Sequence, residues 1–393
     1  MATQTWRRGA LALAAGVTSA AILAPVASAN GSGGGAKHRW GGVSVEATPT
    51  VVSDNLNNPR QIAIKRDTVY VAEAGTGGTS CIGTGEEQAC IGFTGSVTRV
   101  GPNDQSTRIQ TGLLSVNSPE GDVVGVDALT FRGNKLYGIA TSSCDLAGVP
   151  PEVLAQAGKV LRLDGGTSFT AVGDASTIEC TTDPDGQGPD SNPYGTVAQG
   201  KRFFIADSGG NDIVSIKNGT TTVASVLSKT GQPVPTSLAI GPDGALYIGT
   251  LNFECGPGNA AVYRLAKGSD TATVYAGGLS AITGIAFDKH GTLYVSEFTT
   301  AFGPTGPSPD GDVVAIPWGG GTEGRTVIGA GSLHFPGGVG VDSYGNVYVS
   351  NWSILPGTDV PGNPFGAGAH GQLVRFDSLY DGKGHGHGRH GYR

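Results

Sequence analysis

Residues 235–250 read PTSLAIGPDGALYIGT: a short apolar strand, an Asp-Gly turn and a second strand centred on Tyr247. The same order of strand, turn and aromatic-centred strand recurs at residues 58–73, 126–141, 192–207, 282–297 and 336–351. A repeat of this size cannot bury a core alone, so neighbouring repeats must stack on one another. The repeats therefore predict an all-β fold, a six-bladed β-propeller in which each repeat supplies one blade.

A third strand follows each hairpin and a fourth follows all but the last, which predicts four-stranded blades. The last unit stops after GQLVRF at 371–376, whereas EATPTVVSDNL at 46–56 precedes the first hairpin. We therefore expect this N-terminal strand to complete the last blade and close the ring, which leaves only short, protected sheet edges. One aromatic residue per repeat is expected to pack between blades: Tyr70, Tyr137, Phe204, Tyr247, Tyr294 and Tyr348.

The ends of the chain differ from the repeats. Residues 1–29 have the features of a signal peptide: Arg7-Arg8, an apolar run, and Ala27-Ser28-Ala29 as the cleavage site. The residues after Arg8 fit a twin-arginine signal poorly, which favours ordinary secretion. We expect residues 30–44 to be a flexible Gly-rich segment, 45–378 to form the propeller, and 379–393 to be a disordered His/Gly-rich tail. The mature protein is then extracellular and monomeric, with no membrane span.

Composition limits the partners of the chain. Its net charge is −7, and only 15% of its residues are charged. Nucleic-acid binding depends on a basic surface that neutralises phosphates, so this class of partner is excluded. The expected partner is an extracellular small molecule, glycan or protein.

Five cysteines in an exported chain predict disulfides. Cys81 and Cys90 lie in one glycine-rich segment and are expected to pair. Cys144 is expected to pair with Cys180, because both lie on one face beside the same blade, which leaves Cys255 free. The spacing offers no zinc motif as an alternative.

Long connections are confined to one face of the predicted ring. They cover residues 74–94, 142–157, 177–191, 299–310 and 352–370. Loops longer than about 12 residues in a compact domain are usually functional or disordered. We therefore expect a binding surface on this face.

The second strand of several repeats ends on that face with an oxygen-bearing residue: Glu73, Asp207, Glu297 and Asn351. Arg60, Tyr194 and His334 are expected beside them, at the rim of the central channel. A ring of oxygens suits Ca²⁺, which takes about 6–8 oxygen ligands. The alternative is a network of ion pairs in which Arg60 bridges Glu73. No cofactor other than Ca²⁺ is expected.

The segment DPDGQGPDSN at 183–192 is a second candidate calcium site. Asp183, Asp185 and Asp190 supply oxygens, and the glycines allow the loop to bend. The spacing differs from an EF-hand, and the terminal bidentate Glu is missing. The alternative is a loop of Asx turns and prolines.

The strand–turn–strand unit resembles the NHL repeat. NPRQIAI…VYVAEAGTGG, the Cys81/Cys90 loop and PDGQGPDSNPYG at 184–195 resemble more closely the ScyD/ScyE family of secreted propellers. This resemblance covers about residues 45–378. It implies an exported propeller and supplies no catalytic residues.

Two classes of function follow. In the first, the protein binds a ligand or partner, or acts as a scaffold, through its long-loop face. In the alternative, it is a metal (Ca²⁺)-dependent lyase or lactonase-type hydrolase whose cation lies at the mouth of the channel, with His334 or Glu297 as base. A quinone-dependent dehydrogenase fits less well, because its anionic cofactor needs a basic pocket. No motif for a nucleophilic hydrolase or zinc protease is present.

Overall fold

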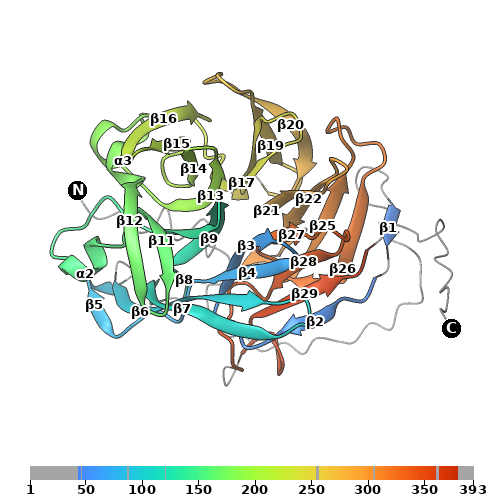
Figure 1. The fold of residues 1–393 in the computed structure, drawn as a ribbon, viewed down its shortest axis with the longest axis horizontal. Helices are drawn as coiled ribbons and strands as arrows, with labels where there is room; N and C mark the ends of the chain where they lie inside the picture. Colours follow the sequence, from blue (N-terminus) through green and yellow to red (C-terminus); the bar gives the residue numbers. More distant parts are fainter. Residues whose placement is uncertain are drawn as a thin grey trace, which may run out of the picture.

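The computed structural model describes residues 43–45, 47–85, 88–119, 121–253, 256–303, 306–359 and 363–378. Figure 1 shows six sheets arranged in a ring, with one strand of each sheet near the centre. These central strands are β3 (Pro59–Lys65), β9 (Val126–Arg132), β13 (Pro193–Gln199), β17 (Pro235–Ile240), β21 (Ile282–Phe287) and β27 (Val339–Val341). The six-bladed propeller expected from the repeats is confirmed.

In each blade the strands follow the chain outward from the centre, because short turns join antiparallel neighbours. Blade 1 adds β4 (Thr68–Glu73), β6 (Ala89–Val100) and β7 (Ser106–Asn117), with the short strands β5 (Ser80–Ile82) and β8 (Val123–Val124). Blade 2 adds β10 (Lys135–Ala140), β11 (Lys159–Gly165) and β12 (Ser168–Asp174). Blade 3 adds β14 (Arg202–Asp207), β15 (Asp212–Lys217) and β16 (Thr220–Val226). Blade 4 adds β18 (Leu246–Thr250), β19 (Ala260–Leu265) and β20 (Ala272–Leu279).

The last two blades contain the N-terminal strands. Blade 5 adds β22 (Leu293–Glu297), β25 (Asp310–Ile316) and β26 (Thr326–His334), and β1 (Val43–Val45) pairs in parallel with β26. Blade 6 adds β28 (Val347–Asn351), β29 (Gln372–Phe376) and β2 (Thr50–Ser53). β2 runs antiparallel to β29, with Val51 opposite Val374. The ring is therefore closed as expected, by an N-terminal strand that completes the last blade.

The repeated aromatic side chains lie between blades. Tyr70 of blade 1 contacts Phe131 of blade 2 edge-on, with ring centroids 5.0 Å apart. Tyr137 of blade 2 contacts Phe203 of blade 3, with centroids 4.7 Å apart. Aromatic pairs of this kind contribute about 0.5–1.5 kcal/mol beyond the area that they bury. The repeat thus supplies both the strands and the contacts that hold neighbouring sheets together.

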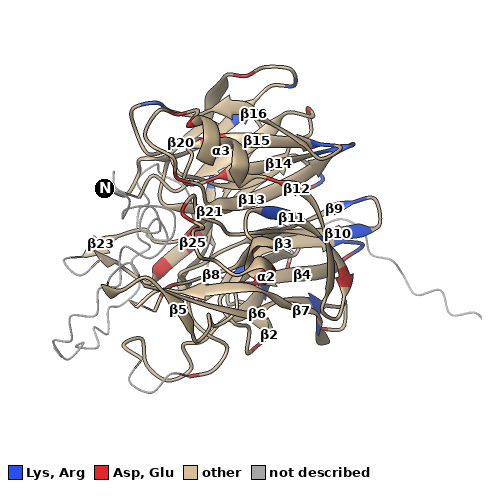
Figure 2. Ribbon diagram, turned by 90° about the vertical axis from the view of Figure 1, so that its left-hand side faces the viewer, with Lys and Arg blue, Asp and Glu red and all other residues tan. Residues whose placement is uncertain are grey.

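The two faces of the ring differ in their connections. One face, here the turn face, has the short turns between first and second strands, as at residues 66–67 and 133–134. The opposite face, here the loop face, has the long connections 74–88, 141–158, 175–192, 298–309 and 352–371. They include the helices α2 (Pro151–Leu154) and α3 (Ser176–Thr182) and the small hairpin of β23 (Phe302–Gly303) and β24 (Gly306–Pro307). In Figure 2, β23 and the ends of β9 and β10 lie on opposite sides of the ring.

Both expected disulfides are present on the loop face. Cys81 and Cys90 are directly opposite each other in the β5–β6 pair and are bonded. Cys144 and Cys180 are also bonded, with Cα atoms 5.2 Å apart, and join the segment after β10 to α3. Cys255 lies outside the described residues, as do residues 1–29, expected to be a signal peptide, and residues 379–393, expected to be a tail. No helix in the described part of the chain has the length and apolar character needed to cross a membrane.

Candidate functional site

Glu73, at the end of β4, is fully buried and bound within blade 1. Its carboxylate accepts hydrogen bonds from Arg108 Nη2 at 2.7 Å, Thr98 Oγ1 at 2.6 Å and the backbone N–H of Asn57 at 2.8 Å. Arg108 lies on the outer strand β7. The ion-pair partner of Glu73 is therefore Arg108, and not Arg60 as in the sequence-based alternative.

The other strand-end oxygens have the same local role. Asp207 accepts from Asn192 N at 2.6 Å, and Asn351 Oδ1 accepts from His334 N at 2.7 Å. Glu297 accepts from Ser280 N. Asn192 and Ser280 lie in the segments that lead into the first strands of blades 3 and 5, and His334 is the last residue of β26, just before the first strand of blade 6. Each oxygen therefore satisfies a backbone group that the sheet itself leaves unpaired.

The described residues contain one group of acidic side chains close enough to hold a metal ion. It consists of Glu179, Asp183 and Asp185, whose ligand oxygens lie within 4.8 Å of one another. Glu179 lies on α3, and Asp183 ends this helix in a left-handed conformation with φ 44°. That turn directs the chain back, so Asp185 comes close to Glu179. Two of the three residues belong to the calcium loop expected from the sequence, and the acidic triad could bind a metal.

Asp190, the third residue expected in that loop, is not a member of the triad. Its backbone N–H lies 3.4 Å from Glu179 Oε1. Asp185 is held by Asn211 Nδ2 at 3.0 Å, and the Asp183 carboxylate accepts from the N–H of Gly188 at 3.2 Å. The loop is thus folded around the triad by its own hydrogen bonds.

Asp212, at the start of β15, extends the acidic cluster. Asp212 and Glu179 are both fully buried, and Glu179 Oε2 and both carboxylate oxygens of Asp212 have no hydrogen-bond partner. Burial raises the pKa of Glu179 to about 8, and the charge of Asp207 adds to this effect. Burial, with the charges of Asp207 and Glu179, also raises the pKa of Asp212 well above its ordinary value. Buried carboxylates so close together require protons or a cation for compensation.

Sequence reasoning missed Glu179 and Asp212. Glu179 precedes Asp183 by one helical turn, a spacing that places two side chains on the same face of a helix. That spacing was the available signal for Glu179. Asp212 has no comparable signal, since only the packing of blade 3 brings β15 to α3.

Arg60, Asp127 and Tyr194 lie near the loop-face end of the channel. Arg60 Nε is 3.4 Å from Asp127 Oδ1, and its Nη1 donates to the carbonyl of Ser353 at 2.9 Å. Its Nη2 donates to the carbonyl of Val123. Burial raises the pKa of Asp127 to about 7, although the Arg60 charge opposes the shift. Tyr194 is buried. Arg60 therefore ties blades 1, 2 and 6 together at this end of the ring.

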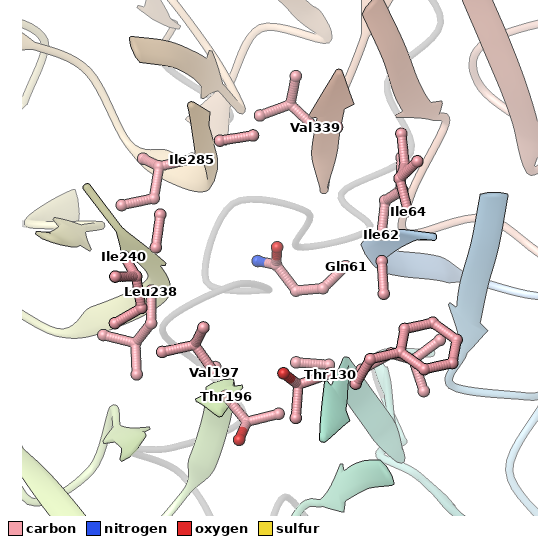
Figure 3. Close-up of a pocket in the computed structure, with 18 of the residues that line it drawn as sticks. Gln61, Ile62, Ile64, Thr130, Thr196, Val197, Leu238, Ile240, Ile285 and Val339 are labelled. Atoms are coloured by element: carbon pink, nitrogen blue, oxygen red, sulfur yellow. The ribbon is translucent and has the colours of Figure 1, made fainter. Parts of the chain in front are cut away.

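Gln61 extends across the channel (Figure 3). Its Nε2 donates to the carbonyl of Thr283 on β21 and lies 3.5 Å from that of Thr236 on β17. Beyond Gln61 a cavity of about 390 Å³ extends along the halves of the six central strands that lead into the turn face. Figure 3 shows aliphatic side chains around it, among them Ile62, Leu238 and Ile285.

His334 lies farther out on the loop face. Its ring is stacked on Trp352, with centroids 4.5 Å apart, and its Nδ1 is 3.6 Å from Asp310 Oδ1. Burial lowers the pKa of His334 despite this carboxylate. His334 contacts the strand-end oxygens through its backbone N–H, which donates to Asn351 Oδ1.

The family comparison covers the ring from the outer strands of blade 2 to β28 of blade 6. A family model described as the SMP-30/Gluconolactonase/LRE-like region matches residues 152–357, just over half of the chain. The chain belongs to the SMP-30/gluconolactonase/LRE-like family. The match supports this broader family and does not address the resemblance to the narrower ScyD/ScyE family, which remains a prediction. A search of curated proteins gave no match.

Several solved structures are similar to this family member. A putative oxidoreductase (glucose dehydrogenase) from Thermus thermophilus has a TM-score of 0.51 and 14% identity, with coverage of 84% of this chain and 99% of its own. Regucalcin, a calcium-binding protein from Agrobacterium tumefaciens, has a TM-score of 0.48 and 11% identity, with 86% and 99% covered. Virginiamycin B lyase from Staphylococcus aureus has a TM-score of 0.43 and 14% identity, with 78% and 83% covered. At 14% identity, the likeness to the Thermus thermophilus protein concerns the fold alone.

Proposed function

We propose that this family member is an extracellular binding propeller that holds Ca²⁺ beside blade 3 and presents its loop face to a small molecule, glycan or protein. The strongest support is a set of buried carboxylate oxygens without hydrogen-bond partners. Glu179 Oε2 and both oxygens of Asp212 are buried without a hydrogen-bond partner, next to the triad that contains Asp183 and Asp185. A divalent cation held by the triad would neutralise Glu179 and balance the charge of the neighbouring Asp212.

The donor set favours Ca²⁺ over other metals. All candidate ligands are oxygens, which suit hard cations, and the described part of the site contributes neither thiol nor imidazole. Ca²⁺ accepts several carboxylates in irregular geometry, whereas Mg²⁺ requires a near-octahedral shell and retains several waters. Glu179, Asp183 and Asp185 would hold the ion, with Asp212 beside them. Extracellular modules bind Ca²⁺ with dissociation constants of about 10⁻⁴ to 10⁻³ M, a range that this site would match.

The ion would act on structure. It would join α3, the 183–192 loop and β15, and the Cys144–Cys180 bond anchors the same helix. The loop face would then have a fixed shape beside blade 3. A fixed loop surface lowers the entropy that is lost when a partner binds.

Catalysis is the second candidate, because the family includes gluconolactonases. It would require a cation on the channel axis, held by Glu73, Asp207, Glu297 and Asn351. Hydrogen bonds within the blades already engage these four residues. Hydrolysis of gluconolactone that is lost in Glu297→Ala and retained in Glu179→Gln would support this candidate over the binding role.

The proposal is tested by thermal unfolding with EGTA and with Ca²⁺. Ligand at 100 times its dissociation constant stabilises the folded state by about 2.7 kcal/mol. We expect Ca²⁺ to raise the melting temperature of the wild type, and Glu179→Gln and Asp212→Asn to lose most of this rise. Without Ca²⁺ these variants should be at least as stable as the wild type, because a buried carboxyl is removed. Glu152→Gln, an exposed residue of α2 on the same face, is the matched control. An equal response to Ca²⁺ in all four proteins would contradict the proposal.

A further inference from the structure

The cavity of the central channel lies apart from the loop face and from the acidic cluster. Its lining comes from the halves of β3, β9, β13, β17, β21 and β27 that lead into the turn face. Gln61 crosses the channel at the inner end of this cavity and is hydrogen-bonded to the carbonyl of Thr283 on the far side of the ring. The cavity therefore has its floor at Gln61 and its mouth at the turn face.

The lining is suited to an organic molecule. None of its side chains is charged; aliphatic side chains and the rings of Phe131 and Phe287 form part of the wall, and polar atoms form somewhat more of it. The free edges of the central strands add backbone N–H and C=O groups that can orient a ligand. A volume of about 390 Å³ lies within the range of small-molecule sites, roughly 300–1,000 Å³.

Charges around the mouth are distributed unevenly. The first turns of blades 1 to 3, with the strand ends beside them, contain a single acidic residue, Asp67. They contain six basic residues: Lys65, Arg66, Arg132, Lys135, Lys201 and Arg202. The corresponding turns of blades 4 to 6 contain Lys289 and three acids, Asp243, Asp288 and Asp342. One half of the mouth is therefore basic, although the whole chain has a net charge of −7.

The basic residues are close to the lining, and their side chains donate to neutral groups. Lys65 Nζ lies 4.7 Å from the ring centroid of Phe131, which lines the cavity. Lys65 donates to Asn134 Oδ1 at 2.9 Å, Arg132 to Tyr137 Oη at 3.3 Å and Arg202 to Ser215 Oγ at 2.9 Å. All three acceptors are neutral, so these contacts do not cancel the positive potential.

From this arrangement we propose a second binding site: the channel takes a small organic anion, with its partly apolar body in the cavity and its acidic group beside Lys65 at the mouth. The apolar part of the body gains from contact with the aliphatic side chains, at about 25 cal/mol per Å² removed from water, and its polar groups can pair with the backbone edges of the central strands. The acidic group gains from the uneven charge, which also speeds its encounter with the mouth. The site is independent of Ca²⁺ and of the loop face.

The test uses two fluorescent probes with the same ring system. 8-Anilinonaphthalene-1-sulfonate carries an anionic group, and N-phenyl-1-naphthylamine is its uncharged counterpart. We expect the folded wild type to bind the sulfonate about fivefold more tightly than the amine, as one favourable surface charge contact allows. Lys65→Gln should weaken the binding of the sulfonate and leave the binding of the amine unchanged. Lys289→Gln, on the acidic half of the mouth, should change the affinity for neither probe.

Filling the channel tests the location. Ile240→Trp and Val341→Phe enlarge lining side chains and should each abolish the binding of both probes. Either variant suffices if the other fails to fold. The proposal is overturned if the wild type binds neither probe, if it binds both equally, if a folded channel-filling variant binds like the wild type, or if Lys289→Gln weakens the sulfonate as much as Lys65→Gln. Identical titrations in EGTA and Ca²⁺ would separate this site from the calcium site.

Discussion

Glu73 and Arg108 form a bidentate ion pair across blade 1, with Arg108 Nη2 2.7 Å from Glu73 Oε2 and Nε 3.1 Å from Oε1. The carboxylate is fully buried, whereas the arginine side chain is 41% exposed. The strand-end oxygen on which a channel-mouth cation would depend is therefore neutralised inside its own blade. The same pair gives the first prediction.

Arg108→Ala should destabilise the protein more than Glu73→Gln. Removing the arginine leaves the Glu73 charge buried without its partner, which costs about 3–5 kcal/mol. Removing the carboxylate frees an arginine that water can solvate, and loses hydrogen bonds to a charged group worth about 1.5–3 kcal/mol. Chemical denaturation of both variants measures the difference. The reverse order would contradict this description of the pair.

His370 should make stability depend on pH. Its Nε2 is 2.6 Å from Asp54 Oδ1, just after β2, and its Nδ1 is 2.9 Å from Asp359 Oδ1. Burial lowers its pKa, but the hydrogen bonds to Asp359 and Asp54 outweigh burial and raise the pKa above 6.5. The stabilisation is therefore complete below the unfolded pKa and is lost as the pH rises through the folded pKa.

We accordingly expect His370→Gln to lower the melting temperature clearly at about pH 5.5, below the unfolded pKa, and progressively less as the pH rises through the raised folded pKa. His290→Gln, in the β21–β22 turn on the other face, serves as the control. A deficit in His370→Gln that is constant with pH would argue against an ionised His370.

The two disulfides should differ in their contribution. The Cys144–Cys180 bond closes a chain of 36 residues and the Cys81–Cys90 bond one of 9. Because a bond that closes a longer loop removes more entropy from the unfolded chain, the expected stabilisation is about 4 kcal/mol for Cys144–Cys180 and about 3 kcal/mol for Cys81–Cys90. Double Cys→Ser variants of each pair should show the larger loss for Cys144 and Cys180. Equal losses on urea denaturation would indicate that strain or residual structure outweighs chain entropy.

Ring closure should depend on β2 and not on β1. A chain that starts at Asn58 lacks β2, together with the buried side chains of Val52 and Leu56, and leaves an outer edge of blade 6 unpaired. It should aggregate, because exposed sheet edges pair with other chains. A chain that starts at Ala47 retains β2 and should stay folded. A monomeric, folded chain from Asn58, judged by size-exclusion chromatography and circular dichroism, would refute this role of β2.

The fold was predictable because its signals are local and repeated. The turn and the aromatic residue around Tyr247 recur in every blade, and the missing outer strand of blade 6 indicated where residues 46–56 must pair. The candidate site was predictable only where its oxygens lie within one loop, as for Asp183 and Asp185. Asp212 joins them through packing, and Arg108 reaches Glu73 from the outer strand of the blade. Gln61 crosses the axis at a position where the other repeats have different residues, so the repeat could not indicate it.

We infer that the buried carboxylates beside blade 3 hold one calcium ion. Isothermal titration calorimetry of the EGTA-treated protein with CaCl₂ tests it most directly. We predict a single bound Ca²⁺ per chain in the wild type and in Glu152→Gln. Binding should be lost in Glu179→Gln and Asp212→Asn. Absence of Ca²⁺ binding in the wild type, or wild-type binding in both Glu179→Gln and Asp212→Asn, would contradict the account.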